Sequence, residues 1–201
     1  RTPAPAPPAP APRECGRGAA PAREERPVLG SAHERREQRR ASPATRIELL
    51  VPDFRGRLDR ALAILQGCPP DVINHNLETV EALYPKIRRP PEFYRRSLGV
   101  LAAAKRMGAR TKSGLMIGLG EAPEDVLRTF ADLRGTGCDL LTVGQYLRPS
   151  ADHLPVDRYV SPDEFRMFYD SGMRMGYRHV ESGPLVRSSY HAWEQVQAAG
   201  V

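Results

Sequence analysis

Cysteine is scarce in this 201-residue sequence, which has only Cys15, Cys68 and Cys138. The three lie far apart, so there is no Cys-x-x-Cys pair and no Cys-x-x-x-Cys-x-x-Cys cluster motif, and an odd number argues against a closed disulfide framework. This usage is typical of a reducing compartment, and we expect a cytoplasmic protein. We expect Cys68 and Cys138 to be small buried hydrophobic residues.

Long apolar runs are also absent. No stretch approaches the ~18 consecutive apolar residues that a membrane helix needs. The start of the sequence lacks the apolar segment of a secretory signal. We therefore expect no interaction with a membrane.

Positive charge is concentrated at the amino end. The net charge is +6, and residues 1–46 hold ten arginines against five glutamates, which leaves the rest of the chain almost neutral. The basic segment has no aromatic side chain that could stack on a nucleic-acid base. We therefore do not expect nucleic acid as the main partner, although a basic-tailed nucleic-acid accessory protein stays an alternative.

Residues 1–45 differ from the rest in composition. They hold nine of the 20 prolines, begin with alternating proline and alanine, and contain few large apolar side chains. Such a segment buries too little apolar surface to offset the entropy of ordering. We expect a disordered or extended tail at 1–45, a folded domain at 46–195 and a short tail at 196–201.

From residue 46 the sequence alternates between strand and helix patterns. The predicted strands span 46–52, 71–77, 111–120, 139–147 and 179–182, and the predicted helices span 54–65, 90–108, 123–133 and 161–176. Ser161 to Glu164 form a predicted capping box, with proline at the first helical position.

This alternation predicts an α/β fold with a parallel sheet covered by helices. An open doubly wound sheet and a part of a (β/α) barrel of the TIM type both fit the pattern. In either case, reactive side chains are expected at the carboxyl ends of the strands.

The predicted strand ends are polar. His75, between two asparagines, is either a base or metal ligand, or a side chain that only forms a local hydrogen bond. Gly118-Leu-Gly120-Glu121 either lets backbone N–H groups approach an anion or forms an ordinary tight turn, since it lacks the further residues of a nucleotide fingerprint. Lys112, one of only three lysines beside 27 arginines, is either a point charge in a site or a solvated residue at a strand edge.

The run Arg187-Ser188-Ser189-Tyr190-His191 follows the last predicted strand. Its hydroxyl groups lie beside basic side chains, which fits a nucleophile or an anion site, whereas the alternative is a polar surface turn. Serine nucleophile chemistry is disfavoured because no Gly-x-Ser-x-Gly elbow is present.

Taken together, these blocks resemble the lipoyl synthase family of the radical S-adenosylmethionine superfamily. The resemblance runs from about residue 46 to 195, and it rests on blocks at 48–56, 74–79, 111–121, 143–147, 153–156, 159–165 and 182–191. Several of these blocks, such as Thr-Lys-Ser-Gly-Leu-Met-Ile-Gly-Leu-Gly-Glu, are distinctive of the family.

The resemblance implies a partial (β/α) barrel and an enzyme that inserts sulfur at C6 and C8 of an octanoyl group on a carrier-protein lysine. It implies S-adenosylmethionine and two [4Fe-4S] clusters, one that cleaves S-adenosylmethionine to a 5′-deoxyadenosyl radical and one that donates sulfur. The implied partners are octanoylated lipoyl domains of 2-oxoacid dehydrogenase complexes and the glycine cleavage H protein.

The same resemblance implies a set of site residues. Those expected near S-adenosylmethionine or closing its site are Asn74, Asn76, Glu78, Lys112, Gly114, Met116, Gly118, Glu121, Gln145 and Arg187. A serine of the Arg-Ser-Ser-Tyr motif is expected to bind the auxiliary cluster, and we favour Ser189 over Ser188.

The chain departs from the family towards its amino end. Both cysteine motifs that hold the clusters are absent, and residues 13–45 do not continue the family pattern. We expect that the chain begins mid-gene, that 13–45 arises from a frame error or a divergent insertion, and that the chain as given is inactive. A non-catalytic remnant that binds the lipoyl carrier domain is an alternative.

Overall fold

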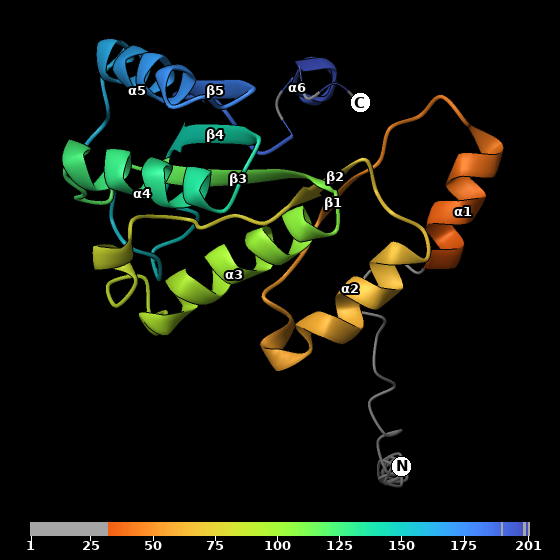
Figure 1. Ribbon diagram of the computed structural model, residues 1–201. Coiled ribbons are helices and arrows are strands. Elements are labelled where there is room, and N and C mark those ends of the chain that lie inside the picture. The colour runs from red at the N-terminus through yellow and green to blue at the C-terminus, as the bar shows by residue number, and fades with distance from the viewer. Residues whose placement is uncertain (1–31, 190, 199, 201) are drawn as a thin grey trace, which may run out of the picture.

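A five-stranded parallel sheet forms the centre of the protein in a computed structural model that describes residues 32–189, 191–198 and 200 (Figure 1). The strands are β1 (Glu48–Leu50), β2 (Val72–Asn74), β3 (Arg110–Ile117), β4 (Leu140–Gln145) and β5 (His179–Gly183). The helices are α1 (Ala32–Ala41), α2 (Leu58–Gln66), α3 (Glu92–Arg106), α4 (Pro123–Gly135), α5 (Pro162–Arg174) and α6 (Ala192–Ala198), with 3-10 turns η1 (Phe54–Gly56) and η2 (Glu81–Leu83).

Every strand and helix predicted between residues 46 and 182 is present. The predicted strand at 71–77 is shorter than expected, because the chain leaves β2 after Asn74 and returns to β3 only at Glu78, which forms an isolated bridge with Leu115. α6 was not predicted, and it crosses the boundary expected between residues 195 and 196.

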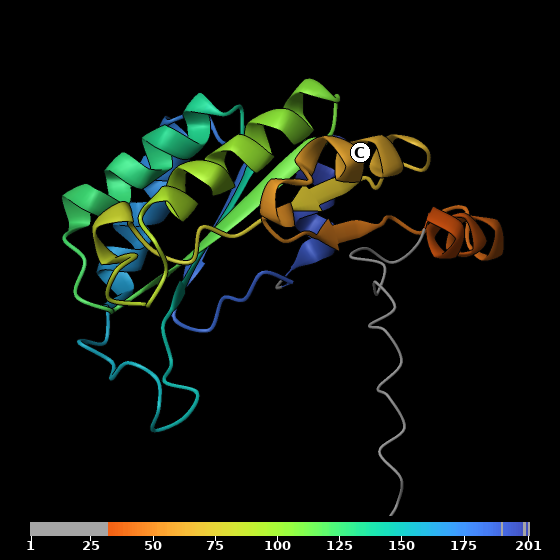
Figure 2. The ribbon, with the colours of Figure 1, turned by 90° about the horizontal axis from the view of Figure 1, so that it is seen from below.

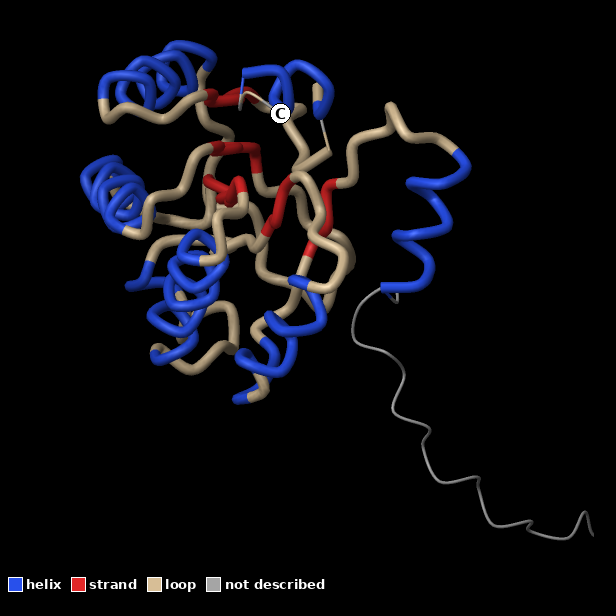
Figure 3. Tube along the Cα trace, turned by 45° about the vertical axis from the view of Figure 1, so that its right-hand side comes forward, coloured by secondary structure: helices blue, strands red, loops and turns tan. Residues whose placement is uncertain are grey.

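The order of the strands decides between the two sheet types. The strands follow one another as β1-β2-β3-β4-β5, and all neighbouring pairs are parallel. A doubly wound sheet needs a point where this order reverses, whereas sequential right-handed crossovers place every helix on the same face. Figures 2 and 3 show α2 to α5 outside a curved sheet. The fold is therefore the (β/α) barrel type, open at β1 and β5 among the described strands.

Two clusters of buried side chains join the helices to the sheet. The larger one contains Phe130, Phe168 and Tyr177 and lies between α3, α4, α5 and the outer face of the sheet. The smaller one, around Leu65 and Ile73, fixes α2. The helices of both clusters pack on the outer face of the sheet. The side chains of the inner face are therefore available for a site.

The start of α5 confirms the predicted cap. The hydroxyl of Ser161 accepts a hydrogen bond from the backbone N–H of Glu164 at 3.2 Å, and Pro162 is the first helical residue. The Glu164 carboxylate does not complete the box. It pairs instead with both guanidinium nitrogens of Arg158 at 2.6 and 2.7 Å, which lowers the pKa of Glu164 and ties the preceding loop to the helix.

The prediction of a disordered or extended tail at 1–45 is wrong for residues 32–41, which form α1; residues 1–31 lie outside the described residues. Arginine side chains attach this helix to the loop after α2. Arg35 donates to the Cys68 carbonyl at 2.9 Å and Arg39 pairs with Asp71 at 2.9 Å. Polar contacts of arginine side chains hold this helix in place, so a low content of apolar residues alone does not exclude it.

Candidate functional site

Several predicted site residues meet at one small cavity above the carboxyl ends of the strands. The cavity has a volume of about 200 Å³. The predicted residues among its lining are Asn76, Glu78, Gly114, Met116, Gln145, Arg187 and Ser188. Thr142 and Gly144 of β4 also line it, and neither is among the predicted site residues.

Gly114 forms part of the floor of this cavity. A Cβ atom at this position would lie 2.5 Å from Thr142 Oγ1 and 3.0 Å from Asn76 Oδ1, so no larger residue fits without a shift. Asn76 Oδ1 is buried and has no hydrogen-bond partner among the described residues. Since a buried acceptor without a partner is unfavourable, a ligand that offers an N–H or O–H donor would satisfy this oxygen.

Glu78 is held in an uncommon backbone conformation beside the same cavity. Its φ is +73°. Its backbone N–H donates to the Gly114 carbonyl at 3.3 Å, and its carbonyl accepts from Met116 N at 2.7 Å, so two residues of β3 hold it. Burial raises the pKa of the Glu78 carboxyl, and the positive charge of Arg89 partly opposes this. A carboxyl group fixed in this way can accept hydrogen bonds from two adjacent hydroxyl groups.

Glu121 closes a turn of the backbone. Its two carboxylate oxygens accept the backbone N–H groups of Gly118 at 2.6 Å and of Leu119 at 2.9 Å. Gly118 has a φ of +98° and Gly120 a φ of +103°, the left-handed region that favours glycine. The structure thus favours the tight-turn interpretation of Gly118-Leu-Gly120-Glu121.

Gln145 is similarly occupied. Its side-chain nitrogen donates to the Arg158 carbonyl at 3.1 Å, and its side-chain oxygen accepts from Val160 N at 2.9 Å. Gly118 gives Gln145 the space it needs, because a Cβ there would collide with the side-chain nitrogen. Gln145 and Gly118 therefore hold the 157–160 segment against the end of β3.

Lys112 is fully buried on the inner face of the sheet and does not lie at a solvated strand edge. Its ammonium group lies 3.0 Å from Glu48 Oε2 and donates a hydrogen bond to the carbonyl of Ser188. Glu48 Oε1 accepts from Asn74 Nδ2 at 2.8 Å. Desolvation lowers the pKa of Lys112, and the Glu48 carboxylate opposes that effect.

Glu48 was not predicted as a site residue. The only signal in the sequence is an acidic residue inside the apolar strand 47–51. Glu48, Asn74 and Lys112 together link three parallel strands to the segment that follows β5. The Glu48 carboxylate contacts the Lys112 ammonium and the side-chain nitrogen of Asn74, and Asn74 Oδ1 remains buried without a partner among the described residues.

The segment after β5 covers the inner face. A Cβ on Gly144 would collide with the carbonyl oxygen of Val186, so the segment lies directly on β4. Arg187 and Ser188 both line the small cavity, and Arg187 and Ser189 are exposed. Tyr190 lies outside the described residues. The structure thus brings Arg187 and Ser188 to the predicted site, and the choice between the two serines as a cluster ligand stays a prediction.

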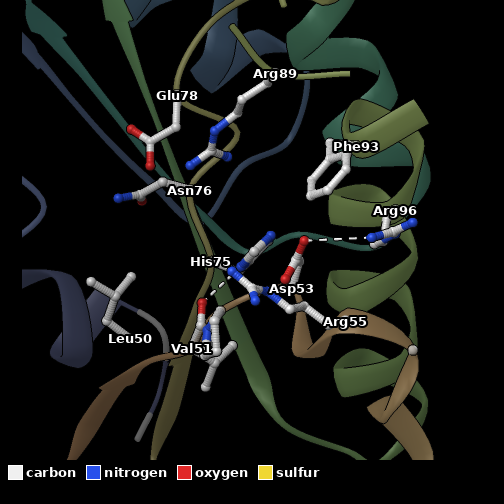
Figure 4. A pocket seen from close by; sticks show the side chains of 12 residues that line it. Leu50, Val51, Asp53, Arg55, His75, Asn76, Glu78, Arg89, Phe93 and Arg96 are labelled. Carbon is white, nitrogen blue, oxygen red and sulfur yellow. Dashed lines mark hydrogen bonds and ion pairs between the residues drawn. The ribbon is translucent and has the colours of Figure 1, made fainter. Parts of the chain in front are cut away.

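A second, larger cavity of about 910 Å³ adjoins the first and shares Asn76 and Glu78 with it (Figure 4). His75, which is 5% exposed, projects into it. Three arginines, Arg55, Arg89 and Arg96, also line this cavity.

The two described cysteines do not fit an iron–sulfur cluster at this site. Cys68 precedes β2 and Cys138 precedes β4, so both lie at the amino ends of the strands, opposite the cavities. Both are buried and free, as predicted, and burial raises the pKa of the Cys138 thiol to about 12. Three thiolates for each of two clusters would need six cysteines, and this sequence has three.

Comparison with known proteins identifies the superfamily. The Radical SAM superfamily pattern matches residues 23–133, so it begins within the segment 13–45 that we expected to depart from the family. None of the described helices is both long and apolar enough to cross a bilayer. A solved structure of the HMG-CoA lyase from Brucella melitensis has a similar fold, with a TM-score of 0.52 at 17% identity, covering 84% of this chain and 56% of that one.

Curated relatives narrow the similarity. The lipoyl synthase of Verminephrobacter eiseniae is 58% identical over 165 residues, which are 81% of this chain and 49% of that protein. The lipoyl synthase of Burkholderia mallei is 56% identical over 168 residues, which are 83% of this chain and 51% of that protein. The chain thus spans about half the length of these relatives. These matches confirm the resemblance seen in the sequence: the chain belongs to the Radical SAM superfamily, and within it the chain is similar to lipoyl synthases.

Proposed function

We propose that this chain supplies the S-adenosylmethionine-binding part of a lipoyl synthase, an enzyme that inserts two sulfur atoms at C6 and C8 of a protein-bound octanoyl group. The similarity to lipoyl synthases supports the family. The observation that carries the proposal is the unpartnered Asn76 Oδ1 facing a cavity floored by Gly114. S-adenosylmethionine bound beside a [4Fe-4S] cluster supplies radical chemistry that removes hydrogen from unreactive carbon atoms.

The residues present fit a nucleoside with vicinal hydroxyl groups. Asn76 Oδ1 would accept one hydroxyl or amine hydrogen, and the Glu78 carboxyl group would accept two more. Gly114 lets Thr142 and Asn76 pack closely against β3, and Gly144 lets the Val186 carbonyl lie directly on β4, so both glycines shape the walls of the cavity. Arg187, at the rim, would close the cavity. The neighbouring loop is shaped by Gly118, Glu121 and Gln145, so these residues affect the ligand only through that loop.

Neither of the two described cysteines lies at this site, so the ligands for an iron–sulfur cluster are not in place. Sulfur insertion by the 201 residues alone is therefore not expected. After reconstitution with iron and sulfide, we expect well under one [4Fe-4S] cluster per chain and no 5′-deoxyadenosine. Measurable turnover would overturn this part of the proposal. The proposed partners are octanoylated lipoyl domains of 2-oxoacid dehydrogenase complexes and the glycine cleavage H protein, in the cytoplasm.

Binding of S-adenosylmethionine by equilibrium dialysis tests the site. Asn76→Ala should weaken binding about tenfold, the size expected for one or two lost hydrogen bonds. Ser113→Ala is a matched control, because Ser113 Oγ is also buried and unpartnered on β3 but does not line the cavity. Equal binding by the native chain and both variants, or no binding at all, would contradict the proposal.

A further inference from the structure

The last strand and the last helix bring metal-ligating side chains together. Glu181 lies on β5, His191 directly precedes α6, and Glu194 lies in the first turn of α6. One oxygen of each carboxylate and one imidazole nitrogen all lie within 4.8 Å of one another. None of these three residues lines either of the two cavities described above. They therefore form a group of donors outside the proposed S-adenosylmethionine site.

The separations in this group match those of ligands around one small cation. His191 Nδ1 lies 3.5 Å from Glu181 Oε1 and 3.3 Å from Glu194 Oε2. Both separations are longer than the roughly 2.7–3.2 Å of a usual N–H···O hydrogen bond. Zinc bonds of about 2.0–2.1 Å in a tetrahedral arrangement place neighbouring ligand atoms about 3.3 Å apart. The imidazole nitrogen is thus spaced from each carboxylate as two ligands of one cation would be.

The charges around the group also favour a cation. The two carboxylates bring two negative charges within 4.8 Å of each other, which is unfavourable unless positive charge lies between them. The Lys112 ammonium group is already paired with Glu48 at 3.0 Å. A protonated His191 would neutralise only one of the two carboxylates, whereas a divalent cation would neutralise both.

His179 holds the Glu181 carboxylate in place. The two residues are two positions apart on β5, so their side chains share one face of the sheet. His179 Nε2 lies 3.0 Å from Glu181 Oε1. Because a carboxylate only accepts, Nε2 carries the hydrogen and is not itself a ligand atom. A hydrogen bond of this kind to a ligating carboxylate is usual in metal sites.

We propose that Glu181, His191 and Glu194 bind one divalent cation of the zinc class, with His179 as a positioning residue. One imidazole, two carboxylates and a water molecule make the four ligands that zinc accepts. An imidazole ligand disfavours Mg²⁺ and Ca²⁺, which take oxygen ligands. The cation would join β5 to the start of α6 and so fasten both ends of the segment 184–189, which covers the inner face of the sheet. The proposal rests on these contacts alone and is independent of S-adenosylmethionine binding.

Competition with a chromophoric zinc chelator measures the affinity of the full chain for Zn²⁺. We expect one Zn²⁺ per chain, which excess Mg²⁺ does not displace. His191→Asn and Glu194→Gln should each weaken binding by at least about a hundredfold, since loss of an outer hydrogen-bond partner alone costs about 10–100-fold. Asn suits position 191 because it tolerates the left-handed backbone that His191 adopts, with a φ of +49°. Glu194 is 61% exposed, so its substitution should not unfold the chain.

Two variants test the positioning role of His179. His179→Leu should weaken zinc binding about tenfold, because the Glu181 carboxylate loses its donor. His179→Gln should restore most of the affinity, because its amide can still donate to Glu181. If both variants bind zinc equally, His179 does not act through this hydrogen bond.

Matched controls separate this site from other zinc ligands in the chain. His153→Gln removes an exposed histidine that bonds to Ser150, and Cys15→Ser removes a thiol. Ser189→Ala removes the serine that we favour as a cluster ligand. All three variants should bind zinc as the native chain does. Equal weakening in His153→Gln or Cys15→Ser would indicate adventitious zinc binding only, and equal weakening in Ser189→Ala would place the ion elsewhere; each result overturns the proposal.

Trypsin gives a second measurement that does not depend on the chelator. Zinc should slow cleavage after the exposed Arg187 several-fold in the native chain and have no such effect in His191→Asn. Circular dichroism of each variant shows whether the fold is retained. The proposal is wrong if the native chain binds no zinc, if Mg²⁺ displaces it, or if bound zinc leaves cleavage at Arg187 unchanged.

Discussion

The ammonium group of Lys112 lies 3.0 Å from the carboxylate of Glu48, although 64 positions separate the two residues in the sequence. The Lys112 side chain is completely buried, and that of Glu48 is 20% exposed. The pair connects β3 to β1 across β2, where Asn74 completes the contact. The Lys112 ammonium also donates a hydrogen bond to the carbonyl of Ser188, so the same group attaches the segment after β5.

Loss of one partner of this ion pair should destabilise the fold strongly. Lys112→Met leaves the Glu48 carboxylate without its counter-charge, and we expect a loss of about 3 kcal/mol in the free energy of unfolding. The double variant Lys112→Met with Glu48→Gln should recover most of this loss, because it removes both charges and the Gln oxygen can still accept from Asn74. Urea unfolding measures both values. A double variant no more stable than Lys112→Met would contradict this account.

The same double variant should release the segment after β5. Without the Lys112 ammonium, the Ser188 carbonyl has no donor, and the exposed Arg187 becomes easier for trypsin to reach. We expect cleavage after Arg187 to be faster than in the native chain even though global stability is largely restored. Mass spectrometry of a time course identifies the site. Unchanged cleavage at Arg187 would show that the segment is held by its other contacts.

His75 should make the protein less stable in mild acid. Its pKa is lowered by burial from 6.5, so the unfolded chain binds a proton that the folded chain does not, at pH values between the lowered pKa and 6.5. Stability from this group is therefore complete above pH 6.5 and is lost as the pH falls through the lowered pKa. His75→Asn should show a weaker fall in the urea midpoint between pH 7.5 and pH 5. Parallel curves for the two proteins would refute the prediction.

The fold could be predicted because its signals are local. The buried strand Leu140–Gln145 begins with the apolar and β-branched run Leu-Leu-Thr-Val, and Ser161 with Pro162 marks the start of α5. The sheet type could not be predicted, since periodicity gives strands but not their order. Helix α1 was missed because arginine side chains, and not an apolar face, hold it to Cys68 and Asp71.

The candidate site could be predicted only in part. The resemblance placed Asn76, Glu78 and Gly114 together, and the structure brings them to one cavity. It gave no indication of Glu48, because the contact with Lys112 depends on the order of three strands and not on sequence spacing. Sequence spacing also does not show that the Glu121 carboxylate accepts hydrogen bonds from the backbone of its own turn. These bonds occupy the oxygens that a ligand would otherwise contact.

The buried cysteines should be chemically inert in the folded protein. Burial raises the pKa of the Cys138 thiol to about 12, so almost none is present as the reactive thiolate at pH 8. We expect Cys68 and Cys138 to resist iodoacetamide in native buffer and to react in urea, as read by peptide mass spectrometry. Fast native labelling of Cys138 would contradict its placement.

Gly144 offers a test of how closely the segment after β5 lies on the sheet. A methyl group there would collide with the Val186 carbonyl, which is backbone and cannot move alone, so Gly144→Ala should displace the segment. Because Val186, Arg187 and Ser188 line the small cavity, this variant should also lose S-adenosylmethionine binding. Gly99→Ala is the matched control: nothing lies within 4 Å of its added methyl group, and it should stabilise α3 by about 0.5–1 kcal/mol and leave binding unchanged. If Gly144→Ala binds as well as Gly99→Ala, the segment does not form a wall of the site.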